Sequence, residues 1–124
     1  MKMSILTVLG IGLATGTAWA DGDAVKGEQV FKKCMACHSA TDKTNKVGPY
    51  LVGVVGRKVA SIEGFNYSDN MKEYGATGAV WDEATLSTYL ENPKAVVAKT
   101  KMAFAGLKKG DERVDLIAFL KSKM

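Results

Sequence analysis

The sequence predicts a small all-α domain of three to four helices joined by long loops. Apolar residues recur at helical spacing in several segments, each bounded by residues that commonly cap or stop helices. Two stretches between them, 39–66 and 93–110, have little periodicity and much turn chemistry. The strand pattern of a βαβ unit is missing. Helices are therefore expected to form the framework.

The first helix is expected over residues 24–36. Asp23 can cap its N-terminus, and Val30 and Cys34 fall on one side of it. Gly27 has a poor helix propensity, which suggests that another element approaches the backbone there.

Two shorter helices are expected in the middle of the chain. One covers Ser68–Tyr74, with Ser68 as its cap and Gly75 as its stop. The other covers Glu83–Glu91; Asp82 can cap it, and Asn92-Pro93 ends it.

The last helix opens with Asp111-Glu112 and finishes with Lys121 and Lys123. Charges of these signs match the helix dipole at both ends. Its apolar residues are Val114, Leu116, Ile117, Phe119 and Leu120.

Residues 1–20 are typical of a cleaved secretory signal peptide. Lys2 precedes an apolar run from Ile5 to Leu13, and Ala18-Trp19-Ala20 has the small-x-small pattern of a cleavage site. The run is shorter than the ~20 residues of a membrane span, and no second run follows. We therefore expect a periplasmic, soluble and monomeric protein of one domain, residues 21–124. The chain's formal net charge of +4 is too small for a strongly basic nucleic-acid binder.

Cys34-Met35-Ala36-Cys37-His38 is a C-x-x-C-H motif that uses both cysteines and the only histidine of the chain. The motif indicates attachment of a c-type haem. Two thiols at this spacing can form thioethers with the two vinyl groups of one porphyrin, and the adjacent imidazole can ligate the iron. A large apolar group also supplies core that long loops can wrap. The predicted fold is therefore a few helices and long loops around one covalent haem.

Other interpretations of the motif need residues or patterns that the sequence does not offer. A Cys34–Cys37 disulfide of the thioredoxin type would leave His38 incidental, and the βαβ pattern expected around it is missing. A zinc site would need a fourth ligand, and the chain has no other cysteine or histidine.

The residue on the second face of the iron decides the function, because an open site binds gases or peroxide and a closed site passes electrons. Met35 lies between the two thiols, Met124 is terminal, and Met71 lies in an expected helix, where methionine commonly fills core. Met102 lies in an irregular loop that can curve over a flat ring, and we expect it to be the sixth ligand. Its rivals are two lysines of the same loop, Lys99 and Lys101.

Residues 21–124 resemble class I cytochrome c, in particular the mitochondrial-like branch that includes the bacterial cytochrome c2 proteins. The resemblance covers essentially this whole range and rests on the haem motif together with further segments in the family's order. These segments are Val47-Gly48-Pro49, Gly56-Arg57-Lys58, Gly64-Phe65-Asn66-Tyr67, Trp81, Tyr89-Leu90-Glu91-Asn92-Pro93, Thr100-Lys101-Met102-Ala103-Phe104-Ala105-Gly106 and Leu116-Ile117-Ala118-Phe119-Leu120.

The resemblance implies a role for each site residue. Cys34 and Cys37 would carry the thioethers, and His38 and Met102 would be the axial ligands of the iron. Pro49 resembles the proline whose carbonyl accepts the imidazole N–H, a contact that fixes the ring.

The resemblance also implies residues that support the haem. Arg57, Tyr67 and Trp81 resemble the residues that hold a buried propionate. Tyr89 resembles the tyrosine beside the axial sulfur. Gly27, together with Phe31, resembles the crossing point between the first and last helices.

Three features depart from the family pattern. Ala98-Lys99 stands where the family usually has Pro-Gly, and Met71 stands where it has an asparagine. The stretch from Tyr67 to Trp81 is longer than in the mitochondrial pattern. These departures concern the Met102 loop and the hydrogen bonds near the propionates, and they leave the ligand residues unchanged.

The resemblance implies a carrier of single electrons and not an enzyme, since a six-coordinate iron has no free site for a substrate. The implied partners are a quinol–cytochrome c reductase as donor and a terminal oxidase or photosynthetic reaction centre as acceptor. Two groups of lysines would give a positive docking face at the haem edge. They are Lys32, Lys33, Lys43 and Lys46 beside the motif, and Lys94, Lys99, Lys101, Lys108 and Lys109 around the Met102 loop.

Other functions stay open at this point. The protein could be the dedicated electron acceptor of one periplasmic dehydrogenase, or a gas-binding haem protein with a labile sixth ligand. Carbon monoxide binding to the reduced protein at neutral pH separates the gas binder from the carrier. A visible spectrum separates both from a thiol–disulfide oxidoreductase.

Overall fold

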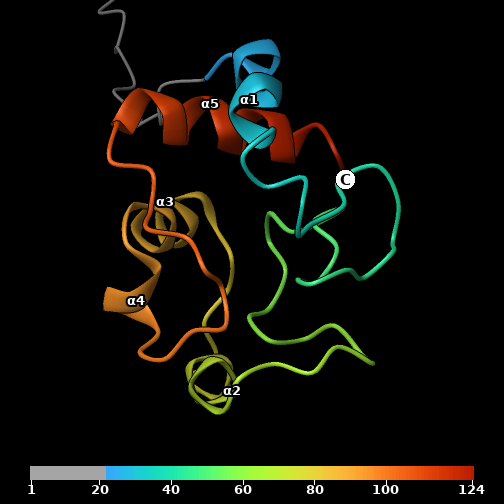
Figure 1. Ribbon diagram of the computed structural model, residues 1–124, viewed down its shortest axis with the longest axis vertical. Helices are drawn as coiled ribbons and strands as arrows, with labels where there is room; N and C mark the ends of the chain where they lie inside the picture. Colours follow the sequence, from blue (N-terminus) through green and yellow to red (C-terminus); the bar gives the residue numbers. More distant parts are fainter. Residues whose placement is uncertain (1–21) are drawn as a thin grey trace, which may run out of the picture.

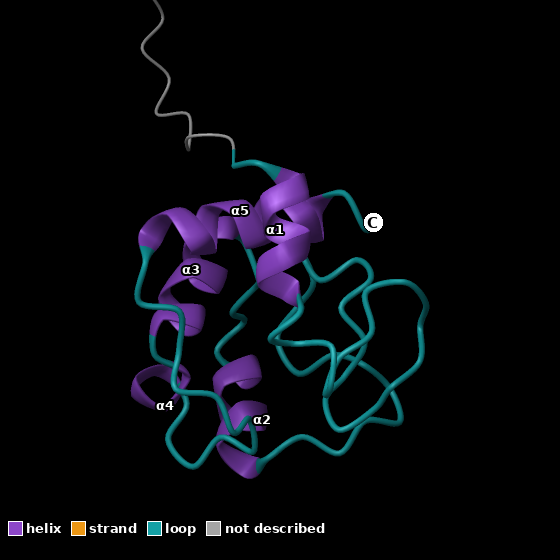
Figure 2. Ribbon diagram, turned by 45° about the horizontal axis from the view of Figure 1, so that its top comes forward, coloured by secondary structure: helices purple, strands orange, loops and turns teal. Residues whose placement is uncertain are grey.

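The computed structural model describes residues 22–124, so the expected signal peptide, residues 1–20, lies outside the described residues. The described chain forms a helical domain with two long loops, residues 32–68 and 97–109, and the predicted all-α fold class is confirmed. Figures 1 and 2 show the helices toward one side and the loop that follows α1 on the other. The helices are α1 (Ala24–Phe31), α2 (Asp69–Ala76), α3 (Glu83–Glu91), α4 (Pro93–Val96) and α5 (Gly110–Lys121).

The crossing of α1 and α5 joins the two ends of the described chain (Figure 1). Gly27 lies at the crossing, where a β-carbon would clash with the backbone carbonyl of Asp115. The rings of Phe31 and Phe119 pack beside it, with centroids 5.2 Å apart. The Asp115 carboxylate also accepts the backbone N–H of Asp23 at 2.8 Å. The close approach predicted at Gly27 is therefore confirmed.

α1 ends at Phe31 and does not reach residue 36 as the sequence predicts. Beyond it the backbone hydrogen bonds change to the tighter i to i+3 type, from Lys33 N–H to Val30 O at 3.1 Å and from Cys34 N–H to Phe31 O at 2.7 Å. Residues 32–37 therefore form turns, and His38, which follows them, is half-buried.

α2 begins after the predicted cap, Ser68, whose hydroxyl accepts the Met71 N–H at 3.1 Å. The predicted stop at Gly75 is wrong, because the helix continues to Ala76. A β-carbon at Gly75 would lie 2.6 Å from the Val59 carbonyl oxygen. This glycine therefore allows α2 to pack closely on the preceding loop and does not terminate the helix.

α3 has the predicted bounds and cap: the Asp82 carboxylate accepts the Thr85 N–H at 2.7 Å. The sequence does not predict α4, which lies in the stretch 93–110 that is expected to be irregular; this expectation is wrong for Pro93–Val96. Pro93 is at its first position, where a helix needs no N–H donor and the fixed φ of proline is favourable.

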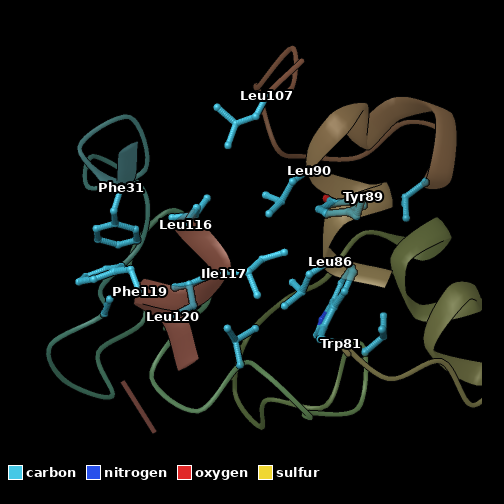
Figure 3. Close-up of a cluster of buried hydrophobic side chains, with 14 residues drawn as sticks. Phe31, Trp81, Leu86, Tyr89, Leu90, Leu107, Leu116, Ile117, Phe119 and Leu120 are labelled. Atoms are coloured by element: carbon cyan, nitrogen blue, oxygen red, sulfur yellow. The ribbon is translucent and has the colours of Figure 1, made fainter. Parts of the chain in front are cut away.

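The hydrophobic core lies between α5, α3 and the loops (Figure 3). Leu116 is its most buried large side chain, with 1% of its surface exposed. Within residues 22–124, no charged or polar side chain is fully buried. No helix in this range has the length and hydrophobicity needed to span a membrane. The labelled core residues are Phe31, Trp81, Leu86, Tyr89, Leu90, Leu107, Leu116, Ile117, Phe119 and Leu120.

Candidate haem site

The four residues expected to hold the haem line one cavity of about 240 Å³. Cys34, Cys37 and His38 come from the turns that follow α1, and Met102 comes from the loop between α4 and α5. These segments are more than 60 residues apart in the chain, so only the folded structure brings them together. Most of the remaining lining is apolar and includes Phe31, Leu51, Val54, Trp81, Leu86, Leu90, Phe104, Leu116 and Leu120.

The turn of the motif is fixed by its own backbone. The Cys34 carbonyl accepts the N–H groups of Cys37 at 3.1 Å and His38 at 2.9 Å. Both cysteines are free thiols. Burial raises the pKa of the Cys34 thiol, and the nearby positive charge of Lys33 offsets this in part. In this conformation both side chains are available for covalent attachment.

The imidazole of His38 is held by the loop that follows the motif. Its Nδ1 lies 2.8 Å from the Pro49 carbonyl oxygen, as the resemblance implies. Burial lowers the pKa of His38, while this carbonyl contact raises it in part. Gly48 lies against the ring, where a β-carbon would clash with its Cε1 atom. With Nδ1 donating to Pro49, the neutral imidazole keeps its lone pair on Nε2.

Met102 lies in a small hydrogen-bonded cluster. The Tyr89 hydroxyl donates to the Met102 sulfur at 3.6 Å and lies 3.2 Å from Oγ1 of Thr100. That oxygen also accepts the backbone N–H of Met102 at 3.3 Å. Tyr89 is buried, which raises the pKa of its phenol, although the bond to Thr100 lowers it in part. The sulfur is therefore oriented by a group that stays protonated at neutral pH.

The rival ligands have different positions. Met71, on α2, also lines the cavity. Lys101 lines it as well, but its ammonium donates to the Asn66 carbonyl oxygen at 3.1 Å. Lys99 is exposed and is not among the described residues that line the cavity.

The residues expected near the propionates all line the cavity. The guanidinium of Arg57 donates to the carbonyl oxygens of Tyr50 at 2.8 Å and Val52 at 2.5 Å. The hydroxyl of Tyr67 accepts the backbone N–H of Ile62 at 3.2 Å. Trp81 packs on Tyr89, with ring centroids 5.0 Å apart.

Sequence reasoning missed Asn70. Its side-chain amide donates to the Ala98 carbonyl oxygen at 2.5 Å and thereby connects α2 with the Met102 loop. Nothing local marks this residue, because a polar residue in the first turn of a helix commonly faces solvent. The only nearby signal is the adjacent departure from the family pattern at Met71.

These residues fit a haem. The cavity offers two thiols for thioethers, an imidazole nitrogen and a soft thioether sulfur as iron ligands, and apolar walls for the macrocycle. The glycine at position 48 leaves room for the imidazole beside the backbone.

Comparison with known proteins agrees with this arrangement. The model of the cytochrome c family matches residues 24–123. The chain belongs to the cytochrome c family.

Individual members of the cytochrome c family match between 78% and 97% of the chain. It is 53% identical over 122 residues to cytochrome c2 of Rhodomicrobium vannielii, covering 97% of this chain and 95% of that protein. It is 55% identical over 98 residues to cytochrome c-550 of Ancylobacter novellus, covering 78% of this chain and 92% of that protein. Among solved structures, cytochrome cH from Methylobacterium extorquens superposes with a TM-score of 0.76 and 43% identity, covering 82% of this chain and 100% of that one.

These comparisons confirm the resemblance to the cytochrome c2 type. They also support covalent haem c as the cofactor, attached through the C-x-x-C-H spacing of Cys34 and Cys37. Members of the cytochrome c family are electron carriers and not enzymes, and this protein is a haem c electron carrier.

Proposed function

We propose that this cytochrome is a periplasmic shuttle for single electrons, with His38 and Met102 as the axial ligands of its haem iron. It would accept electrons from a quinol–cytochrome c reductase and deliver them to a terminal oxidase or a photosynthetic reaction centre. The haem supplies the one-electron redox chemistry when it is bound. The protein supplies the ligands, a mostly apolar pocket and a surface on which partners dock.

The observation that carries the ligand proposal is the bracing of both side chains. His38 and Met102 line the same cavity, and each contacts a group suited to orient an axial ligand. Pro49 O accepts from the imidazole, and the Tyr89 hydroxyl donates to the sulfur. Bracing of this kind favours a closed, six-coordinate iron, because it holds both ligands in place before and after electron transfer.

The docking proposal rests on the charges around the cavity. Lys33 and Lys101 line it, and the remaining lysines of the two predicted groups are exposed. Met35, within the motif, and Val47, in the loop that follows it, are large apolar side chains with 53% and 75% of their surface exposed. An exposed apolar side chain beside a lysine, such as Met35, whose carbonyl accepts the Lys46 ammonium, suits a brief encounter with an acidic partner, because charge speeds association and a small apolar contact allows rapid release.

A visible spectrum of the holoprotein with and without Met102→Ala tests the ligand proposal. We expect a sulfur-to-iron charge-transfer band in the ferric protein that disappears in the variant. The reduced wild-type protein should bind little carbon monoxide at neutral pH. Strong binding would instead indicate the gas-binding alternative with a labile sixth ligand.

Export and partner choice need separate measurements. N-terminal sequencing of the protein recovered from the periplasm should begin at Asp21 if residues 1–20 are the signal peptide. Stopped-flow reduction by a purified quinol–cytochrome c reductase should be fast and salt-dependent. Rapid reduction only by a periplasmic dehydrogenase would favour the dedicated-acceptor alternative.

A further inference from the structure

The turn that leads into the Met102 loop has an unfavourable residue at its third position. The Thr100 N–H donates to the Val97 carbonyl oxygen at 3.2 Å, which makes Ala98 and Lys99 the two central residues of a β-turn. Lys99 has a φ of +55°, whereas Ala98 is not in the left-handed region. Among the standard turns this combination is type II.

Type II turns favour proline at the second position and glycine at the third, because only the third residue must adopt a positive φ. The Pro-Gly pair usual in the family meets both preferences, and Ala98-Lys99 meets neither. A type I turn would give Lys99 an ordinary negative φ. The two turns differ mainly by a flip of the peptide between Ala98 and Lys99, so the local sequence favours the flipped form.

The Asn70 side chain holds that peptide in its observed orientation. Its amide donates to the Ala98 carbonyl oxygen, which belongs to the peptide that would flip. A flip would turn this carbonyl away and break the bond. Asn70 is itself held in place, because it lies in the first turn of α2, next to the residue whose N–H is capped by Ser68.

The orientation of the turn bears on Met102 through Thr100. Thr100 ends the turn, and its hydroxyl contacts both the Tyr89 hydroxyl and the Met102 N–H. A change at the peptide before Lys99 therefore reaches the contacts that orient the Met102 sulfur.

We infer that Asn70 is a positioning residue for Met102: it locks the 97–100 turn in the type II form that its own sequence disfavours. This inference rests on the proposed function, in which Met102 is the sixth ligand. It predicts that the loop opens more readily when the Asn70 amide is removed, and that a glycine at position 99 makes the lock unnecessary.

Competition with added imidazole at constant neutral pH measures this opening. Imidazole binds the ferric iron of the holoprotein only when Met102 is displaced, so its apparent dissociation constant falls as the open fraction rises. The loss of one hydrogen bond in Asn70→Ala should lower that constant by about fivefold. Lys99→Gly alone should raise it by about threefold, because the left-handed position is then relieved.

The double variant, Asn70→Ala with Lys99→Gly, should return close to the wild-type constant. Lys99→Ala is the matched control for removal of the amine, since alanine keeps the strained φ; combined with Asn70→Ala it should give no rescue. Asn92→Ala is the control for loss of an asparagine, because the Asn92 side chain forms no capping hydrogen bond to α4.

The outcomes distinguish an error in the sixth ligand from an error in the role of Asn70. If Met102→Ala leaves imidazole binding and the charge-transfer band unchanged, the sixth ligand in the proposed function is wrong. Suppose instead that Met102→Ala changes both imidazole binding and the charge-transfer band, while Asn70→Ala binds imidazole as the wild type does. Met102 is then still the sixth ligand, but Asn70 does not position it. Equal rescue by Lys99→Gly and Lys99→Ala would also contradict this role of Asn70, since the rescue would then come from loss of the lysine amine and not from relief of the positive φ.

Discussion

The Tyr89 hydroxyl donates a hydrogen bond to the Met102 sulfur, with oxygen and sulfur 3.6 Å apart. The same hydroxyl contacts Thr100, two residues before Met102 in the chain. One buried tyrosine on α3 therefore contacts both the proposed ligand and the loop that carries it.

Tyr89→Phe should lower the reduction potential by an amount on the order of tens of millivolts, because a donor on the sulfur withdraws electron density and favours reduced iron. Spectroelectrochemical titration measures the change. Tyr74→Phe is the matched control: this tyrosine also packs on Trp81, at 6.0 Å between centroids, but does not line the cavity. Similar shifts in both variants would mean that the hydroxyl contact is not the cause.

Gly48→Ala should impair binding of His38 to the iron, since the added β-carbon would clash with the imidazole. We expect reduced haem retention and a loss of stability of about 1–3 kcal/mol, which is typical of overpacking. Haem absorbance per protein and the thermal midpoint report the two effects. Gly110→Ala, where the nearest atom is the Arg113 guanidinium at 3.5 Å, should change neither by much.

At alkaline pH, Lys101 should replace Met102 on the ferric iron more readily than Lys99 does. A lysine can bind iron only after it loses its proton, and only Lys101 of the two lines the cavity. Lys101→Ala should move the alkaline loss of the charge-transfer band to higher pH, and Ala98→Pro should do the same by stiffening the turn. An unchanged midpoint in Lys101→Ala would assign the alkaline ligand to another group.

The cap of α3 should make stability depend on acid pH. The Thr85 N–H bonded to the Asp82 carboxylate lowers the pKa of Asp82. A lowered folded-state pKa gives stability that is complete above the ordinary aspartate pKa, about 4, and is lost as pH falls through the folded value.

Asp82→Ala should therefore cost about 1 kcal/mol in the free energy of unfolding at neutral pH and less in acid. Ser68→Ala removes the hydroxyl cap of α2, which does not titrate, so its cost should not fall in acid. Denaturant unfolding at pH 3 and pH 6 compares the two. A parallel decrease in both variants would exclude the carboxylate as the source.

Charge reversal should slow electron exchange with acidic partners most at the lysines of the proposed docking face. Lys101→Glu and Lys109→Glu should slow reduction more than Lys123→Glu, whose lysine lies over the Phe119 ring at 5.4 Å. Rates should fall as ionic strength rises, because surface charges are screened within a Debye length of ~8 Å at physiological salt. Lys109→Glu is the cleaner of the two, since Lys101 also contacts Asn66. Equal slowing in all three variants would argue against a defined docking face.

The parts of the fold that depend on local chemistry could be predicted from the sequence. Asp23, Ser68 and Asp82 cap their helices as predicted, because a cap needs only the residues of the next turn. The passage of α2 through Gly75 could not, since the close packing of this glycine on the Val59 carbonyl is a tertiary contact. The end of α1 at Phe31 was not predicted either.

The site divides in the same way. The motif predicts that Cys34, Cys37 and His38 act together, and the long loop predicts that Met102 reaches them; all four line the cavity, while their roles as ligands stay predictions. Asn70 was missed because its partner, Ala98, is 28 residues away and no pattern in the sequence connects the two.

The α1–α5 crossing also sets an order of events during biogenesis. Asp23 and Asp115 are 92 residues apart, so their contact cannot form until nearly the whole chain has been made and released. Until α5 arrives, the pocket lacks Leu116 and Leu120, two of its apolar lining residues. An open pocket leaves both thiols accessible, so we expect the nascent chain to be the better substrate for haem attachment. Once α5 packs on α1, the pocket would be closed and haem attachment would become slower.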